Sequence, residues 1–336
     1  MGAHRQGSRP ARQRRAIGEV KPLPPAVRAW SRPVRWCFLA VGALLAAPPW
    51  SAAAATGGAP AAAVQQKAAQ SADWCKRLTP RLPGVTVATC QRSALLPTGS
   101  VSGKGFPILA RRIAASNNNG NQKAVRVLLL GGIHGDELTA SAIVFRWLQF
   151  MHMREAQVFQ WSVIPVVNPD GLLAPKPARV NANGVDLNRN FPTPGWQQDA
   201  PRYWAKVTRS DPRRFPGVAP LSEPETRWVN EEIERYKPHV IISVHAPFGV
   251  LDFDGPAPVP TRFGRLQFNS VGVYPGSLGN YSGRYRNVPV ITIELPNALT
   301  MPPDIEVQRI WQDMLIWINR NISASDLAGK SLPVPR

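Results

Sequence analysis

Short runs of apolar residues alternate along the chain with longer segments in which apolar residues recur at a helical spacing. Apolar runs bounded by turn residues are typical of buried strands. They predict strands at 108–113, 125–130, 161–167, 239–244 and 288–293. The segments with helical spacing predict helices at 138–151, 222–236 and 305–322. Strands that alternate with helices favour an α/β fold in which helices cover both faces of the sheet.

The segment between residues 171 and 221 departs from this pattern, because it has little periodicity and many Pro, Gly and Asn residues. A loop of that length inside a globular domain is usually functional. The residues that follow it have the spacing of a capping box, in which Ser222 caps the first helical turn and Glu225 reaches back. We interpret Glu223 and Glu225 as residues that stabilise the helix N-terminus.

The first 55 residues have the pattern of a secretory signal. A basic region is followed by an apolar run from Cys37 to Ala47 and by small residues, which predicts cleavage near Ala54 or Ala55. The apolar run is shorter than the about 20 residues that a membrane-spanning helix needs. An uncleaved anchor is therefore the less favoured alternative, and we expect no stable membrane anchor after cleavage and a periplasmic or secreted protein. The basic region is unusually long, which leaves the true start codon open.

The pattern divides the chain into four parts. These are a signal peptide at 1–55, a flexible lead-in with a disulfide-pinned segment at 56–97, a single main domain at 98–325 and a C-terminal tail at 326–336. Cys75 and Cys90 are the two cysteines that remain after cleavage, and in an exported protein they predict one disulfide. Closing a loop of this size contributes about 3 kcal/mol in the chain-entropy model.

The formal net charge of +19 invites the hypothesis of a nucleic-acid partner. The first 55 residues contain nine basic residues and one acidic residue, so +8 of this charge lies in the predicted signal. The remaining charge is scattered, without a basic helix interleaved with stacking aromatic residues. We therefore expect no nucleic-acid partner, since an anionic cell-wall environment explains a basic protein equally well.

Candidate chemistry lies at the ends of the predicted strands. His134 and Glu137 are three residues apart on a turn, so both side chains can point at one spot. Alone, that pair is a weak signal, which chance or helix capping would also produce. His245 and Glu294 each follow a later predicted strand, and strand ends are where α/β sheets bind ligands. Two histidines and one glutamate are the ligand set of catalytic zinc hydrolases.

Six short motifs follow one another along the chain. They are HGDE at 134–137, NPDG at 168–171, RVNANGVDLNRNFP at 179–192, SEPET at 222–226, SVHAP at 243–247 and TIELP at 292–296. In this order they resemble zinc metallocarboxypeptidases of the carboxypeptidase A type, and within that type the bacterial murein peptide amidases. The resemblance implies a mixed, mostly parallel twisted sheet with helices on both faces, in a single catalytic domain that holds one Zn²⁺.

The resemblance also implies how the metal is held and used. His134, Glu137 and His245 would bind zinc, and Asp186 would orient His134. Glu294 would be the general base for a zinc-activated water and would then donate the proton to the leaving amine.

Three further residues would act on the substrate. Arg179 would stabilise the oxyanion together with zinc, although another basic residue of that loop could take its place. Asn188 and Arg189 would bind the terminal carboxylate of the substrate, for which a planar guanidinium is suited. The alternative for Asn188 and for Asp186 is that they only shape a turn.

The specificity residues are predicted from the same resemblance. Ser277 and Tyr281 lie in a loop where relatives contact the terminal residue of the substrate, and the aromatic residue that covers the site is either Tyr274 or Tyr281. Asp252 or Asp254 could meet the side-chain ammonium of diaminopimelate, the residue that ends a bacterial cross-link peptide. The alternative is that these two aspartates belong to a solvated loop.

Together these observations predict an exported zinc carboxypeptidase that hydrolyses murein peptides at the γ-D-glutamyl–diaminopimelate bond. The export signal departs from the amidases it resembles, which act on recycled peptides in the cytoplasm. One alternative is a general zinc carboxypeptidase for L-peptides or a related zinc deacylase. A second alternative, a non-catalytic wall-binding module, is disfavoured by the intact set of ligands and base.

Overall fold

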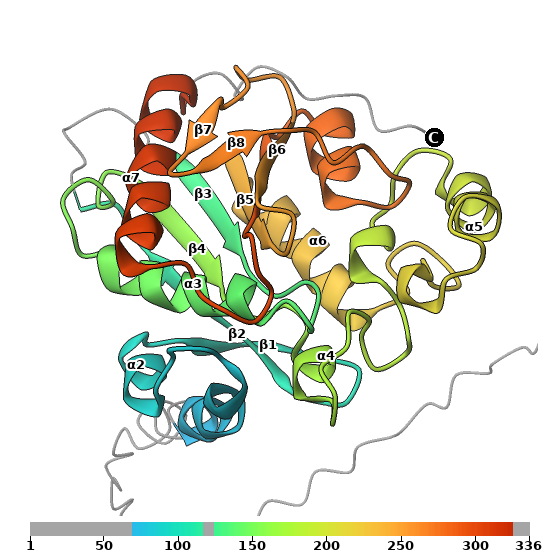
Figure 1. The fold of residues 1–336 in the computed structure, drawn as a ribbon, viewed down its shortest axis with the longest axis horizontal. Helices are drawn as coiled ribbons and strands as arrows, with labels where there is room; N and C mark the ends of the chain where they lie inside the picture. Colours follow the sequence, from blue (N-terminus) through green and yellow to red (C-terminus); the bar gives the residue numbers. More distant parts are fainter. Residues whose placement is uncertain (1–68, 117–123, 325–336) are drawn as a thin grey trace, which may run out of the picture. The chain divides into compact units, whose positions relative to one another are not determined.

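The computed structural model describes residues 69–116 and 124–324, so the predicted signal peptide and C-terminal tail lie outside the described residues. A nine-stranded sheet in the order β1-β2-β4-β3-β5-β9-β6-β8-β7 forms the body of the molecule (Figure 1). The strands are β1 (Leu96–Val101), β2 (Pro107–Ile113), β3 (Arg126–Leu130), β4 (Gln160–Ile164), β5 (Val240–His245), β6 (Val250–Asp254), β7 (Arg262–Phe263), β8 (Leu266–Phe268) and β9 (Val290–Glu294). The helices are α2 (Val87–Arg92), α3 (Leu138–Phe150), α4 (Pro169–Leu173), α5 (Trp196–Lys206), α6 (Pro224–Tyr236) and α7 (Asp304–Asn321), with a further helical segment at 69–78.

The centre of the sheet is parallel and its flanks are mixed. Strands β4, β3, β5 and β9 run parallel to one another. Strands β2 and β6 pair with them in the antiparallel sense. The predicted fold class, a mixed and mostly parallel sheet, is confirmed.

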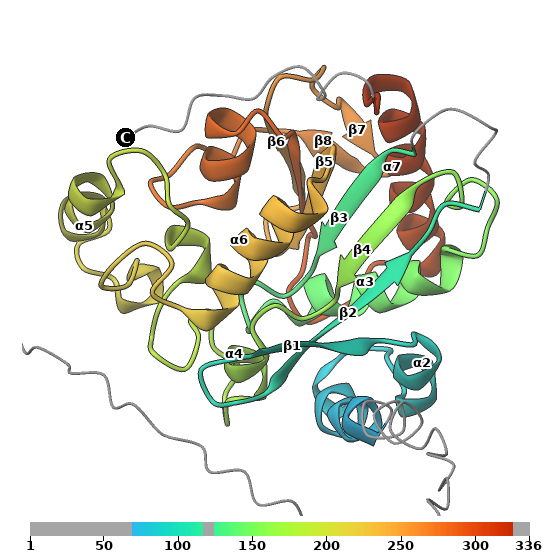
Figure 2. The same ribbon diagram turned by 180° about the vertical axis from the view of Figure 1, so that it is seen from behind.

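Both faces of the central strands are covered, because successive side chains of a strand point to opposite faces. In β3, Val127 and Leu129 belong to one buried cluster, which includes residues of α3 and α7. Leu128 and Leu130 belong to the other, which includes residues of α6. Figure 1 shows α3 and α7 on the near side of the sheet, and Figure 2, from behind, shows α6 on the near side. Burial on both faces explains why these strands consist of continuous apolar runs.

In the segment before the sheet, the predicted disulfide between Cys75 and Cys90 joins the helical segment at 69–78 to α2. Trp74 lies in the helical segment at 69–78, and its ring centroid is 6.2 Å from that of Phe145 in α3. This segment is therefore packed onto the catalytic body through a shared core. Within the described residues, no helix is both long enough and apolar enough to cross a membrane.

Two local expectations need correction. Residues 171–221 are not a continuous loop, because α5 forms within them and buries Trp196 and Ala200. The capping box is also wrong: α6 has Glu223 at its N-cap without a side-chain cap. The Ser222 hydroxyl donates to Glu223 Oε1 at 2.7 Å instead.

Candidate active site

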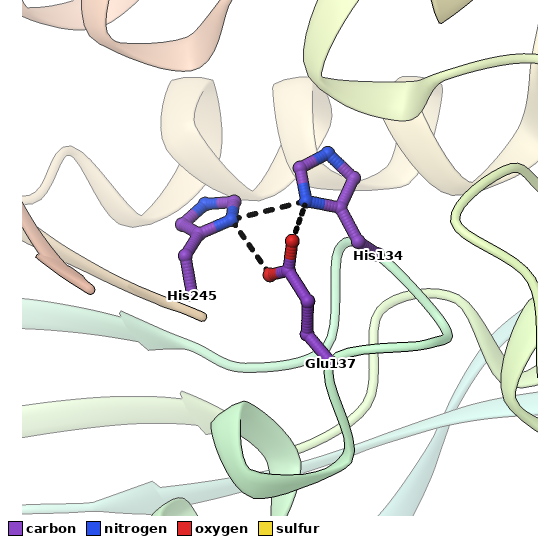
Figure 3. Close-up of side chains that lie close together, drawn as sticks. All are labelled: His134, Glu137 and His245. Carbon is purple, nitrogen blue, oxygen red and sulfur yellow. Dashed lines mark hydrogen bonds and ion pairs between the residues drawn. The ribbon is translucent and has the colours of Figure 1, made fainter. Parts of the chain in front are cut away.

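Three side chains form the candidate metal centre, and each of them is buried. His134 Nδ1 lies 2.7 Å from Glu137 Oε1, and His245 Nδ1 lies 3.1 Å from Glu137 Oε2 and 3.2 Å from His134 Nδ1 (Figure 3). In the part of the chain that the structure describes, this is the single group of His, Cys, Asp and Glu side chains with the spacing of a metal site.

The parallel sheet brings these residues together. His134 lies on the turn after β3, Glu137 is the N-cap of α3, and His245 is the last residue of β5. Glu294 ends the neighbouring strand β9 in register with His245. The carboxyl ends of parallel strands meet at one edge of a sheet, so residues far apart in the sequence converge there.

The turn itself depends on a close backbone approach at Gly135. A Cβ atom at this position would lie 2.3 Å from the backbone of Gly171 and Leu172. Only glycine allows two backbone segments to pass this close without displacement. The glycine in HGDE therefore lets the turn that carries His134 and Glu137 pack against the start of the long segment that carries Asp186.

Each imidazole directs Nδ1 toward the other two candidate ligands, and its Nε2 contacts a residue outside this group. His134 Nε2 lies 3.1 Å from Asp186 Oδ1, and His245 Nε2 lies 3.0 Å from the Ser243 hydroxyl. When Nε2–H of His134 donates to Asp186, Nδ1 presents its lone pair to the centre. Such outer contacts fix the tautomer and the ring direction of metal ligands.

The donor set fits a zinc ion. Ligand atoms about 2.0–2.1 Å from a tetrahedral zinc lie about 3.3 Å from one another, close to the 3.2 Å between the two Nδ1 atoms. Burial opposes ionisation of Glu137, but His134 and His245 outweigh it and hold its pKa well below the usual range. Burial and Arg179 would lower the pKa of His134, yet Glu137 and Asp186 outweigh them and raise it. Surroundings that favour a proton on His134 also favour a metal cation.

Asp186 connects the metal centre to two other predicted residues. Arg179 Nε donates to Asp186 Oδ2 at 3.0 Å, and the backbone N–H of Asn188 donates to Oδ1 at 3.0 Å. Arg179 also reaches Glu137 Oε1 at 3.4 Å. Burial would raise the pKa of Asp186, but Arg179 and His134 keep it well below its usual value. Asp186 is therefore an anion that holds two cationic or polar neighbours in fixed positions.

Glu294 faces the same cavity and differs from Glu137 in its surroundings. Burial raises its pKa. Its Oε2 atom is buried and has no hydrogen-bond partner among residues 69–116 and 124–324. A carboxylate that is close to the ligands and has an oxygen available can accept a proton.

A cavity of about 650 Å³ opens in front of the metal centre. Asn188 and Arg189 line it, as predicted residues for a terminal carboxylate would. Asn188 Oδ1 accepts from the backbone N–H of Leu278 at 2.8 Å, which leaves its Nδ2 group for a ligand. The Arg189 guanidinium carbon lies 4.4 Å from the centroid of the Tyr274 ring, and Arg189 Nε has no partner among the described residues. A buried arginine with an unused donor is suited to bind a carboxylate.

Gly276 sets the distance between the Tyr274 loop and Arg189. Its φ is +75°, and a Cβ atom there would lie 1.9 Å from the backbone oxygen of Arg189. Ser277 follows it and lines the cavity, where its hydroxyl donates to the backbone oxygen of Tyr274 at 3.0 Å. This loop therefore packs directly on the segment that carries Asn188 and Arg189.

Asp252 and Asp254 both line the cavity and are both buried, so they do not belong to a solvated loop. Asp254 Oδ1 accepts from Arg284 Nε at 2.8 Å. Asp252 has no basic partner within 4.0 Å in the described part of the chain. Burial, and secondarily the charge of Asp254, raise the pKa of Asp252. Of the two, Asp252 is the carboxylate that lacks a counterion.

Tyr281 requires a correction, because it does not line the cavity. Its side chain is buried in the core, stacks on Phe191 with ring centroids 5.9 Å apart, and donates to Asn230 Oδ1 at 2.5 Å. Tyr274 is the aromatic residue of this loop that faces the cavity. The loop turns through a π-helical segment, Gly279–Tyr285, which directs Tyr281 inward.

Several residues of this region were not predicted from the sequence. Asn181 Nδ2 donates to Glu223 Oε2 at 2.7 Å and to Glu225 Oε2 at 3.0 Å, so both glutamates anchor the segment before Asp186. Arg213 Nη2 donates to Asp136 Oδ2 at 2.8 Å at the cavity wall. These pairs are 40 or more residues apart in sequence, and no local pattern marks them.

The comparisons with known proteins agree with this geometry. A family model described as zinc carboxypeptidase matches residues 91–251. Murein peptide amidase A of Vibrio campbellii is 32% identical over 217 residues, which are 61% of this chain and 82% of that protein. Murein peptide amidase A of Escherichia coli is 32% identical over 176 residues, which are 50% of this chain and 70% of that protein. The solved carboxypeptidase A of Helicoverpa armigera shares the fold, with a TM-score of 0.53 at 17% identity, over 67% of this chain and 68% of that one.

Proposed function

The chain belongs to the zinc carboxypeptidase family and is a metallopeptidase, and on that premise we propose that it hydrolyses murein peptides at the γ-D-glutamyl–diaminopimelate bond after export. The observation that carries the proposal is the set of residues that line one cavity. It combines the metal ligands, a carboxylate clamp at Arg189 and a buried acidic residue, Asp252, without a counterion. A terminal residue with both a carboxylate and a distant ammonium complements this arrangement.

In the proposed reaction His134, Glu137 and His245 would hold one zinc ion. When bound there, zinc acts as a Lewis acid and lowers the pKa of water. Glu294 takes up the proton of the attacking water on its unpartnered oxygen and then delivers it to the leaving amine. Arg179, fixed by Asp186, presents positive charge to the oxygen on which negative charge develops.

Arg189 and Asn188 select for a free carboxylate. Arg189 is 5% exposed and, within the described residues, has no ion pair, so a substrate without a terminal carboxylate would leave its buried positive charge without a counterion. That penalty favours cleavage of the last residue of a peptide. Asp252 adds preference for an ammonium in the side chain of that residue, which diaminopimelate supplies.

Two features support export. The first 55 residues have signal-peptide composition, and Cys75 is joined to Cys90, a bond typical of oxidising compartments. We therefore propose the periplasm as the place of action, with no membrane anchor after cleavage.

The direct test is digestion of the tripeptide L-alanyl-γ-D-glutamyl-diaminopimelate by the purified, zinc-loaded protein, with products identified by mass spectrometry. An L-dipeptide ending in lysine is run beside it, since a general carboxypeptidase would prefer that substrate. We expect release of diaminopimelate, and none from the Glu294→Gln variant. Zinc-loaded protein that leaves the tripeptide intact would refute the substrate, and hydrolysis by the Glu294→Gln variant at the wild-type rate would refute Glu294 as the general base.

A further inference from the structure

Arg213 is a cationic side chain of the cavity that the reaction described above does not use. It lies in a short 3-10 turn, Pro212–Arg214, whose N-cap is Asp211. Its Nη2 atom donates to Asp136 Oδ2 at 2.8 Å, and within the described residues this is the one ion pair of its side chain. The side chain is 58% exposed, and both partners line the cavity. Arg213 therefore presents positive charge to the cavity and to solvent at once.

The position of this pair is set by the metal-binding turn, because Asp136 lies between the two ligands His134 and Glu137. Its other oxygen, Oδ1, is buried and lacks a hydrogen-bond partner in the described part of the chain. Asp136 is near enough to help raise the pKa of Arg179, the predicted oxyanion residue. The pair thus lies at the cavity wall beside the proposed metal ligands.

The neighbouring Arg214 also lines the cavity. Its Nε is 3.7 Å from Asp211 Oδ2, and its charge helps lower the pKa of Arg189 after the larger effect of burial. Arg189 is the proposed clamp for the carboxylate of the leaving residue. The two adjacent arginines of this turn therefore have different acidic partners, Asp136 for Arg213 and Asp211 for Arg214.

The proposed substrate has a second carboxylate on the acyl side of the bond that is cleaved. A γ-linked glutamyl residue forms its amide through the side-chain carboxyl, so its α-carboxylate stays free. Only Cα, Cβ and Cγ separate that group from the scissile carbonyl, which must reach the metal centre. An anion is therefore held a few bonds beyond the reacting carbon, away from the leaving residue that Arg189 binds.

We propose that Arg213 recognises the free α-carboxylate of the γ-linked glutamyl residue and so makes the enzyme selective for a glutamyl over an isoglutaminyl acyl group. The inference rests on the proposed function. A guanidinium already turned toward the cavity by Asp136 needs little reorganisation to bind a second carboxylate through its remaining donors. Asp136 orients Arg213 and is a positioning residue.

The test compares two tripeptides that differ in one group, the α-carboxylate or the α-carboxamide of the γ-D-linked residue. We expect wild-type protein to favour the carboxylate by about 10-fold in kcat/KM, near the lower end for a charge-assisted hydrogen bond because Arg213 is exposed. Arg213→Gln should abolish this preference, so that the ratio of kcat/KM for the two peptides falls to about one. Arg213→Lys should retain part of the preference, because it keeps the charge but loses the bidentate geometry.

Arg214→Gln is the matched control, since it removes the same charge from the same turn. It should leave the ratio between the two peptides at the wild-type value. An Arg213→Gln variant that keeps the ratio, or wild-type protein that cleaves both peptides equally well, would overturn the inference and leave the proposed function standing. Cleavage of neither peptide by wild-type protein would overturn the proposed function and this inference together.

Discussion

Asp186 offers the sharpest test of how the metal centre is built. The Asp186→Asn substitution keeps the size of the side chain but removes its charge and one acceptor. Asp186 is fully buried and meets His134 Nε2 at 3.1 Å and Arg179 Nε at 3.0 Å, one on each oxygen. An asparagine can accept from only one of these donors, so its amide group must face the other.

We expect Asp186→Asn to lower both the affinity for zinc and the free energy of unfolding. Loss of an outer contact to a metal-binding histidine typically weakens metal affinity about 10- to 100-fold, which corresponds to about 1.4 to 2.7 kcal/mol. We expect the upper part of this range, because Asp186 is ionised throughout the usual assay range and no water replaces it at a fully buried position. The unsatisfied donor should also lower the free energy of unfolding of the metal-free protein by about 1 to 3 kcal/mol.

Zinc affinity is measured by competition with a chromophoric chelator, and stability by denaturant unfolding with and without zinc. The control is Asp199→Asn, since Asp199 is 41% exposed and pairs with Arg202 at the surface. That variant should keep wild-type zinc affinity and change stability by less than about 1 kcal/mol. If Asp186→Asn binds zinc as tightly as the wild type, Asp186 does not orient His134 and the reasoning fails.

Three further outcomes are expected. Glu294→Gln should retain zinc affinity in the chelator assay but lose at least about 100-fold in kcat. Because burial raises the pKa of Glu294, turnover by the wild-type protein should fall as the pH drops through that raised pKa. A pH-rate profile without this decrease at acid pH would contradict the role of Glu294 as the base. His239 is buried and accepts from the backbone N–H of Arg126, and burial, followed by the charge of Arg126, lowers its pKa from 6.5 to about 4. Since the unfolded chain binds a proton in this window that the folded protein does not, stability should fall as the pH decreases from 6.5 to 4, by at most about 3 kcal/mol, and unfolding curves of His239→Gln should show a weaker pH dependence. Replacing both Cys75 and Cys90 with serine should cost about 3 kcal/mol in denaturant unfolding, and an unchanged midpoint would show that the bond does not constrain the unfolded chain.

The burial of His239 illustrates one limit of the sequence. No pattern in the sequence marks this histidine as buried, yet it is 3% exposed and accepts a hydrogen bond from the backbone N–H of Arg126 at the start of β3. The helix α5 illustrates another, because it is rich in polar residues and contains Pro201, and only Trp196 and Ala200 are buried. Apolar periodicity detects elements that bury a wide face. Elements that bury one or two residues leave too weak a pattern.

The choice between Tyr274 and Tyr281 shows what tertiary packing adds. Both lie in the same loop, seven residues apart, and both could cover a site from sequence alone. The π-helical segment places Tyr281 against Phe191 in the core, whereas Tyr274 stacks with Arg189 in the cavity. The direction of a side chain in an irregular loop depends on neighbours that are distant in sequence, and no local pattern encodes it.

By itself, the sequence determined the central strands, the helices α3, α6 and α7, the disulfide and the residues able to bind a metal. It did so because buried parallel strands are apolar throughout and because ligands placed at their carboxyl ends must converge. The tertiary structure alone decided which aromatic residue faces the cavity, which aspartate lacks a counterion, and that Arg213 meets Asp136. Those contacts join segments that only the folded chain brings within a few ångströms, and their energies depend on burial and on charges that the linear sequence does not place.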